Sequence, residues 1–182
     1  ILRRKLEALV HSKQVVMVNS GVGGNTSREG LARFDRDVAA HHPNFVLMQF
    51  GGNDATPEED RAVSVDEYEK NTLEMLDCCR AMDAVALLLT FPPLIDVWHS
   101  FQSHDKFLSK GGPDLCVEEY RERTRAIAQQ TGTILIDVDQ AMRSAIRKHG
   151  VASQILPDGV HLTEGGNQTV ADVAMCSVSG CL

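Results

Sequence analysis

An acid and an imidazole lie three positions apart near the end of the chain, in the run Asp158-Gly159-Val160-His161. An imidazole acts as a general base near neutral pH because its pKa lies close to that pH. A carboxylate beside it fixes the ring tautomer and stabilises the imidazolium that forms during reaction. Within a turn, Asp158 can reach the near ring nitrogen of His161 and leave the far one free. The competing interpretation is a solvated Asp and His at the start of a helix.

Two further loops contain groups that can stabilise an oxyanion. The Gly-rich run 19–26 exposes backbone N–H groups, among them that of Gly24. The run 51–54 contains the side-chain amide of Asn53. Donors of these two kinds can together hold the negative charge that develops in acyl transfer. Plain tight turns would also explain both loops.

A phosphate loop is the other chemistry that the Gly-rich run suggests. The run lacks the third spaced glycine of a dinucleotide fingerprint, and no lysine precedes Thr26-Ser27 as a P-loop requires. A nucleotide-binding protein therefore remains only a weak alternative.

The elements that must position these loops follow from apolar periodicity. Short apolar runs predict four strands, and amphipathic stretches predict helices between them; the strands are expected at 15–18, 45–50, 84–89 and 133–136. Alternating strands and helices predict a parallel sheet with helices on both faces. Functional loops gather at the carboxyl ends of such strands.

The loops 19–26, 51–54 and 90–93 each follow a predicted strand directly, whereas 158–161 lies beyond the fourth strand and its helix. Residues 91 to about 115 contain several aromatic side chains and the breakers Pro92-Pro93 and Gly111-Gly112-Pro113. We expect an irregular loop there that forms a wall of the substrate site or packs on the core.

Composition limits the class of protein. A chain of 182 residues suits one soluble globular domain, and its net charge of −7 argues against a nucleic-acid groove. No apolar run is long enough to span a bilayer. The five cysteines are odd in number and form no CxxC pair, so free thiols in a reducing compartment are expected, which favours the cytoplasm. The oligomeric state cannot be read from the sequence.

Three motifs together resemble those of one family. The run 19–27, Asn-Ser-Gly-Val-Gly-Gly-Asn-Thr-Ser, is similar to the second conserved block of the SGNH (GDSL-type) hydrolases. Gly51-Gly52-Asn53-Asp54 resembles their third block, and the run 158–162, Asp-Gly-Val-His-Leu, their fifth. The order and spacing also agree, and the resemblance covers essentially the whole chain.

The resemblance implies a three-layer α/β/α fold with a flavodoxin-like parallel sheet, and hydrolysis of small-molecule esters or thioesters without a cofactor or metal. It also implies roles for the four residues already singled out. Gly24, through its N–H, and Asn53, through its side chain, would form the oxyanion hole. His161 would be the catalytic base, and Asp158 would orient it.

The chain departs from the family pattern at the first block, Gly-Asp-Ser, which carries the nucleophile. Only eighteen residues precede Asn19, and the one serine among them, Ser12, lies before a predicted strand, at the wrong end of the sheet. Ser20 and Ser27 belong to the second block and are not expected to replace it. Ile1 is not an initiator Met, and the chain opens inside a helical pattern.

We therefore expect residues 1–182 to be a single SGNH-type domain, truncated at its N-terminus and lacking its first strand. In the flavodoxin-like order 2-1-3-4-5 that strand is an inner one, so its loss would leave backbone groups unpaired, each at a cost of about 1–3 kcal/mol. The full-length parent would hydrolyse short acyl, lipid or acetylated-sugar esters, and this segment alone would be inactive. The alternative is a non-catalytic module that binds an acyl or sugar ligand on the same fold.

Overall fold

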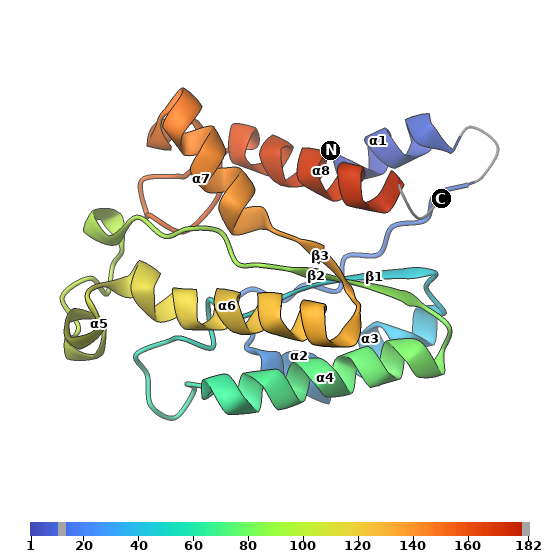
Figure 1. The fold of residues 1–182 in the computed structure, drawn as a ribbon, viewed down its shortest axis with the longest axis horizontal. Helices are drawn as coiled ribbons and strands as arrows, with labels where there is room; N and C mark the ends of the chain where they lie inside the picture. Colours follow the sequence, from blue (N-terminus) through green and yellow to red (C-terminus); the bar gives the residue numbers. More distant parts are fainter. Residues whose placement is uncertain (11–13, 180–182) are drawn as a thin grey trace.

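The computed structural model describes residues 1–10 and 14–179 and has three layers, with a parallel sheet between two layers of helices (Figure 1). The strands are β1 (Phe45–Gln49), β2 (Val85–Leu89) and β3 (Ile134–Ile136), in that spatial order. Phe45 pairs with Val85, and Leu87 pairs with Ile134. The three-layer α/β/α prediction is confirmed.

The helices divide between the two faces of the sheet (Figure 1). One face is covered by α2 (Ser27–Ala32), α3 (Phe34–Asp37), α4 (Val65–Ala81) and α6 (Pro113–Thr131). The other is covered by α1 (Leu2–Leu9), α7 (Val138–His149) and α8 (Glu164–Ser179). The remaining elements are α5 (Asp105–Lys110) and the 3₁₀ turns η1 (Ala39–His41), η2 (Asp96–Trp98) and η3 (Val151–Ser153).

The core lies on both sides of β2, because successive side chains of a strand point to opposite faces. Leu88 packs into the cluster beneath α4 and α6, whereas Leu87 and Leu89 pack into the cluster beneath α7 and α8. All three are buried. An unbroken apolar run in the sequence therefore marks the strand that is covered on both faces.

The helix ends follow local capping chemistry. The Ser64 side chain accepts a hydrogen bond from the Glu67 N–H and starts α4, as its capping-box pattern predicts. Pro113 occupies the first turn of α6, and Gly132 ends that helix in the left-handed conformation. These boundaries place the loops that precede and follow the strands.

The strand predicted at 15–18 is wrong. Residues 15–18 form no regular element, and the side chains of Val16, Met17 and Val18 are exposed, Val16 by 75%. A strand exists only when its backbone pairs with a neighbour, and within residues 1–10 and 14–179 no strand lies beside this segment. Among the described strands, β2 is the one that pairs with β1, so the other edge of β1 has no described strand beside it.

Two other segments also differ from expectation. The stretch from 91 to about 115 is not wholly irregular, because α5 forms within it, with Phe107 buried. The spacing of Leu31, Phe34 and Val38 predicts one helix that starts at Thr26 or Ser27, but it is interrupted at Arg33, which ends α2 and precedes α3. In both places short helices, rather than a loop or one long helix, carry apolar side chains into the core.

Candidate functional site

Asp158 and His161 form a hydrogen-bonded pair within one turn, residues 158–161, which we call the acid–base turn. The Asp158 Oδ2 lies 2.9 Å from the His161 Nδ1. The Asp158 Oδ1 accepts hydrogen bonds from the backbone N–H groups of Val160 and His161, each at 2.9 Å. The Leu156 N–H donates to the His161 carbonyl at 2.8 Å and closes the turn. Neighbouring residues alone therefore orient the carboxylate toward the ring.

These donors also set the charge of Asp158. The backbone N–H of His161, then that of Val160 and then the imidazole, lower the pKa of Asp158 to about 2. The carboxylate is therefore ionised throughout the neutral range and can hold the Nδ1 proton. The His161 side chain is 76% exposed, so its Nε2 can reach a substrate or a nucleophile from solvent.

The loop that follows β2 supports the acid–base turn from below. The Ile95 N–H donates to the Gly159 carbonyl at 2.9 Å. Gly159 has φ +74°, and a Cβ added there would lie 2.6 Å from the Ile95 carbonyl oxygen and 3.1 Å from the Trp98 Cβ. Only glycine fits so close to this backbone. His99 lies behind the turn, where burial lowers the pKa of its imidazole.

Gly24 and Asn53 lie on two loops that contact each other, residues 19–26 and 51–54, which we call the donor loops. The Asn53 Nδ2 donates to the Asn25 carbonyl at 3.1 Å. Arg61 also donates to the Gly24 carbonyl at 2.8 Å. Gly24 has φ +83° and is exposed, so its peptide takes an orientation that other residues rarely adopt.

A buried pair that the sequence reasoning did not single out lies beneath the donor loops. The Asp54 Oδ1 accepts hydrogen bonds from the Ser27 N–H at 2.9 Å and the Ser27 hydroxyl at 2.5 Å, and both side chains have no exposed surface. The sequence shows only that Asp54 follows Asn53 and that Ser27 directly follows the Gly-rich run. The sequence positions of Ser27 and Asp54 did not predict that both side chains would be buried against each other.

The structure brings the predicted residues together in two groups. Among residues 1–10 and 14–179, no hydrogen bond joins the acid–base turn to the donor loops. The serines of the second block are both engaged elsewhere: Ser20 donates to the Asp37 carbonyl, and Ser27 donates to Asp54. Ser12 lies outside the described residues. That neither Ser20 nor Ser27 replaces the missing nucleophile stays a prediction.

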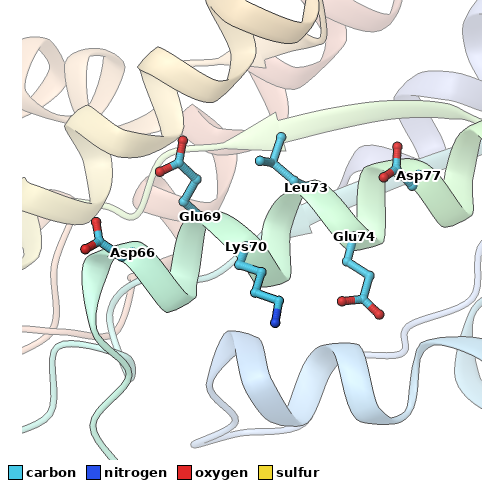
Figure 2. Close-up of a pocket in the computed structure, with 6 residues that line it drawn as sticks. All are labelled: Asp66, Glu69, Lys70, Leu73, Glu74 and Asp77. Carbon is cyan, nitrogen blue, oxygen red and sulfur yellow. The ribbon is translucent and has the colours of Figure 1, made fainter.

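A surface hollow lies elsewhere on the molecule, along α4 (Figure 2). It is lined by Asp66, Glu69, Lys70, Leu73, Glu74 and Asp77. None of these residues belongs to the donor loops or to the acid–base turn. In the part of the chain that the structure describes, no three His, Cys, Asp or Glu side chains gather as metal ligands, and no helix has the length and apolarity to span a bilayer.

A parallel sheet between two helical layers, with a hydrogen-bonded Asp–His pair on one of its loops, defines a protein of the three-layer α/β/α class. The family comparison is more specific. Residues 1–169 match the model of the GDSL-like Lipase/Acylhydrolase family, and the chain belongs to that family. This membership, with an esterase among its relatives, places the chain among the carboxylic ester hydrolases.

Three relatives show how far the similarity extends. The lipoprotein YqeF of Bacillus subtilis is 26% identical over 172 residues, which cover 85% of this chain and 70% of YqeF. An acetylxylan esterase of Geobacillus stearothermophilus is 23% identical over 176 residues, which cover 91% of this chain and 73% of the esterase. LAE5, described as an alpha/beta hydrolase enzyme from the metagenome of Lake Arreo, has a TM-score of 0.80 at 26% identity and covers the whole of this chain and 80% of its own.

The acetylxylan esterase has also been solved, and its fold superposes on this chain with a TM-score of 0.79 over 97% of this chain and 78% of its own, at 21% identity. Its structures include three described as catalytic mutants. They replace a serine, an aspartate and a histidine, the last two being three positions apart.

Proposed function

We propose that this chain supplies the base and the oxyanion hole for the serine-dependent hydrolysis of carboxylic esters. The observation that carries the proposal is the hydrogen bond between the Asp158 Oδ2 and the His161 Nδ1 at 2.9 Å. It fixes the tautomer in which Nδ1 keeps its proton and Nε2 is the basic nitrogen. The separation of three positions also matches that of the aspartate and histidine in the catalytic mutants of the acetylxylan esterase.

Each group has one role in the reaction. A serine Oγ attacks the ester carbonyl carbon, and the His161 Nε2 takes the hydroxyl proton as the new C–O bond forms. The carbonyl oxygen becomes negative and is held by the Gly24 N–H and the Asn53 Nδ2. When the tetrahedral species collapses, His161 returns the proton to the leaving alcohol. Water then repeats the sequence on the acyl-serine and releases the carboxylic acid.

The serine itself is the part that this chain is proposed to lack. The place for it is the unpaired side of β1, because the carboxyl ends of neighbouring parallel strands meet at the same edge of a sheet. A strand added there would end beside the loop of Asn53. The apolar side chains of Leu47 on β1 and of Val16 and Val18 on the preceding segment are exposed, and we expect the added strand to cover part of them.

The substrates we propose are esters of short acyl groups, lipids or acetylated sugars. The acetylated sugars are supported by the acetylxylan esterase among the relatives. We expect residues 1–182 to release no alcohol from such an ester by themselves, because His161 then has no hydroxyl to activate.

The test is to extend the chain upstream of Ile1 with a strand that ends in Gly-Asp-Ser. The extended enzyme should hydrolyse a short-chain aryl ester, and a Gly-Asp-Ala version should not. Substituting His161→Ala should lower the rate by about 10³-fold or more. An inactive extended enzyme, or one whose rate ignores His161→Ala, would overturn the proposal. Binding of an acylated ligand without turnover would support the non-catalytic module instead.

A further inference from the structure

We propose that Asp54 is a positioning residue of the oxyanion hole, and that its carboxylate holds the two donor loops at a fixed distance from each other. This inference rests on the proposed function, because it concerns the roles given there to Gly24 and Asn53. Asp54 itself has no exposed surface and would not touch the substrate.

The Asp54 carboxylate joins its own donor loop to Ser27, the first residue of α2, which directly follows the other donor loop. Its Oδ1 accepts two hydrogen bonds from Ser27, one from the backbone N–H at 2.9 Å and one from the hydroxyl at 2.5 Å. Its Oδ2 accepts from the Gly51 N–H at 3.0 Å, within its own loop. One oxygen therefore holds the residue directly after the Gly-rich loop, and the other holds the start of the loop that carries Asn53.

A carboxylate suits this position because it only accepts hydrogen bonds, and all three groups facing it are donors. The Ser27 hydroxyl can donate to Asp54 while it accepts from the Asn71 Nδ2, which lies 3.1 Å away on α4. An amide in place of the Asp54 carboxylate would turn an NH₂ group toward Ser27 or toward the Gly51 N–H. One donor would then face another donor.

The burial of Asp54 is costly, and only the charge of Arg28, which forms its ion pair with Glu67, acts on it from a distance. Within residues 1–10 and 14–179, no Arg, Lys or His forms a salt bridge with it, whereas the buried carboxylate of Asp139 is paired with Arg121, Arg125 and Arg143. Burial raises the pKa of Asp54 even though hydrogen bonds from Ser27, from Gly51 and from its own backbone N–H oppose the shift. Burying a carboxylate without a salt bridge costs free energy. We therefore infer that this position needs a group that only accepts hydrogen bonds.

Asp54 and Ser27 lie close along the chain to the two proposed oxyanion donors. Asn53 precedes Asp54 directly, and Ser27 lies three residues after Gly24 in a segment whose Thr26 is also buried. The Asn53 Nδ2 already lies 3.1 Å from the Asn25 carbonyl, so this amide points toward the Gly-rich loop. Oxyanion donors act over 2.7–3.1 Å, and a displacement of about 1 Å lowers rates by about 10²-fold.

The first test uses Asp54→Asn in the extended enzyme. We expect kcat for an aryl ester to fall by about 10- to 100-fold, with KM within about twofold, because the loss falls on the transition state. Asp54→Asn should cost less in an Asn53→Ala background than it does alone, because part of its effect on kcat acts through Asn53. Asp60→Asn, an exposed change a few residues away, is the matched control.

A milder variant keeps the test informative where Asp54→Asn unfolds the enzyme. Ser27→Ala removes one of the three donors and should lower kcat by about 3- to 10-fold. An unchanged kcat in folded Asp54→Asn or Ser27→Ala protein would overturn the proposal, and so would a full additional loss in the Asn53→Ala background.

The second test needs no hydrolysis and uses the 182-residue chain. In NMR spectra of Asp54→Asn, the Gly24 backbone amide and the Asn53 side-chain amide should both shift, while the His161 ring resonances stay in place. If only Ser27 and Gly51 respond, the link does not extend to the donors and the proposal fails. Because this readout is independent of turnover, an inactive extended enzyme would count against the proposed function alone.

Discussion

The acid–base turn and the donor loops are held in opposite ways. In the turn, Asp158 and His161 are both exposed and are joined by hydrogen bonds that span no more than three residues. In the donor loops, the contacts between Ser27 and Asp54 span 27 residues and lie wholly within the protein. A site of this kind therefore combines a locally determined half with a half that depends on the fold, and the two halves should fail differently when perturbed.

The largest expected effect on stability is that of removing the buried carboxylate of Asp54, and removing the exposed carboxylate of Asp158 is its comparison. Asp54→Ala leaves the Ser27 and Gly51 N–H groups buried without acceptors, so we expect it to lower the free energy of unfolding by about 3–5 kcal/mol. Asp158→Ala should lower it by about 1 kcal/mol or less, because water replaces the lost contacts of an exposed turn. Urea unfolding of the two variants measures both values, and similar losses would contradict the comparison.

The glycine that begins the loop of Asn53 provides the next contrast. Gly51 has φ +107°, and an added Cβ would lie 2.9 Å from the Tyr120 Cβ, so Gly51→Ala should cost about 2–4 kcal/mol in unfolding free energy. Gly132 has φ +67° in the αL conformation with open space around it, and Gly132→Ala should cost only about 1 kcal/mol. Thermal and urea unfolding of this matched pair separate steric crowding from backbone strain.

The two carboxylates should also respond to pH with opposite signs. The folded-state pKa of Asp158 is lowered to about 2, so its contribution to stability is present above its unfolded pKa of about 3.9 and is lost as the pH falls through 2. The folded-state pKa of Asp54 is raised by burial, so its contribution is greatest below the unfolded pKa and declines as the pH rises through the folded value. Carboxyl ¹³C titrations by NMR check both, and two pKa values below the ordinary range would refute the contrast.

The smallest effect is expected for the exposed link between the donor loops and the next turn. Arg61 donates to the Gly24 carbonyl at 2.8 Å and pairs with Glu58, but its side chain is 45% exposed. Arg61→Ala should therefore change the free energy of unfolding by less than about 1 kcal/mol. A loss as large as that of Asp54→Ala would show that surface contacts, rather than the buried carboxylate, hold the donor loops together.

The sequence predicted the parts of the fold and site that local physics controls. The three strands of the sheet were expected from their apolar runs, and each forms within a residue or two of the expected ends. Asp158 and His161 were predicted to pair because a turn brings positions three apart into contact, and they do so. Such features need only neighbouring residues, so they are readable before the chain is folded.

The tertiary structure decided what depends on distant partners. Residues 15–18 have the composition of a strand but form none, since a strand needs a neighbour for its backbone and none of the described strands supplies one. Asp54 and Ser27 are two ordinary polar residues in the sequence, and only folding buries them against each other. Burial and strand pairing are properties of the whole arrangement, because the energy of each contact depends on which distant segments exclude water from it.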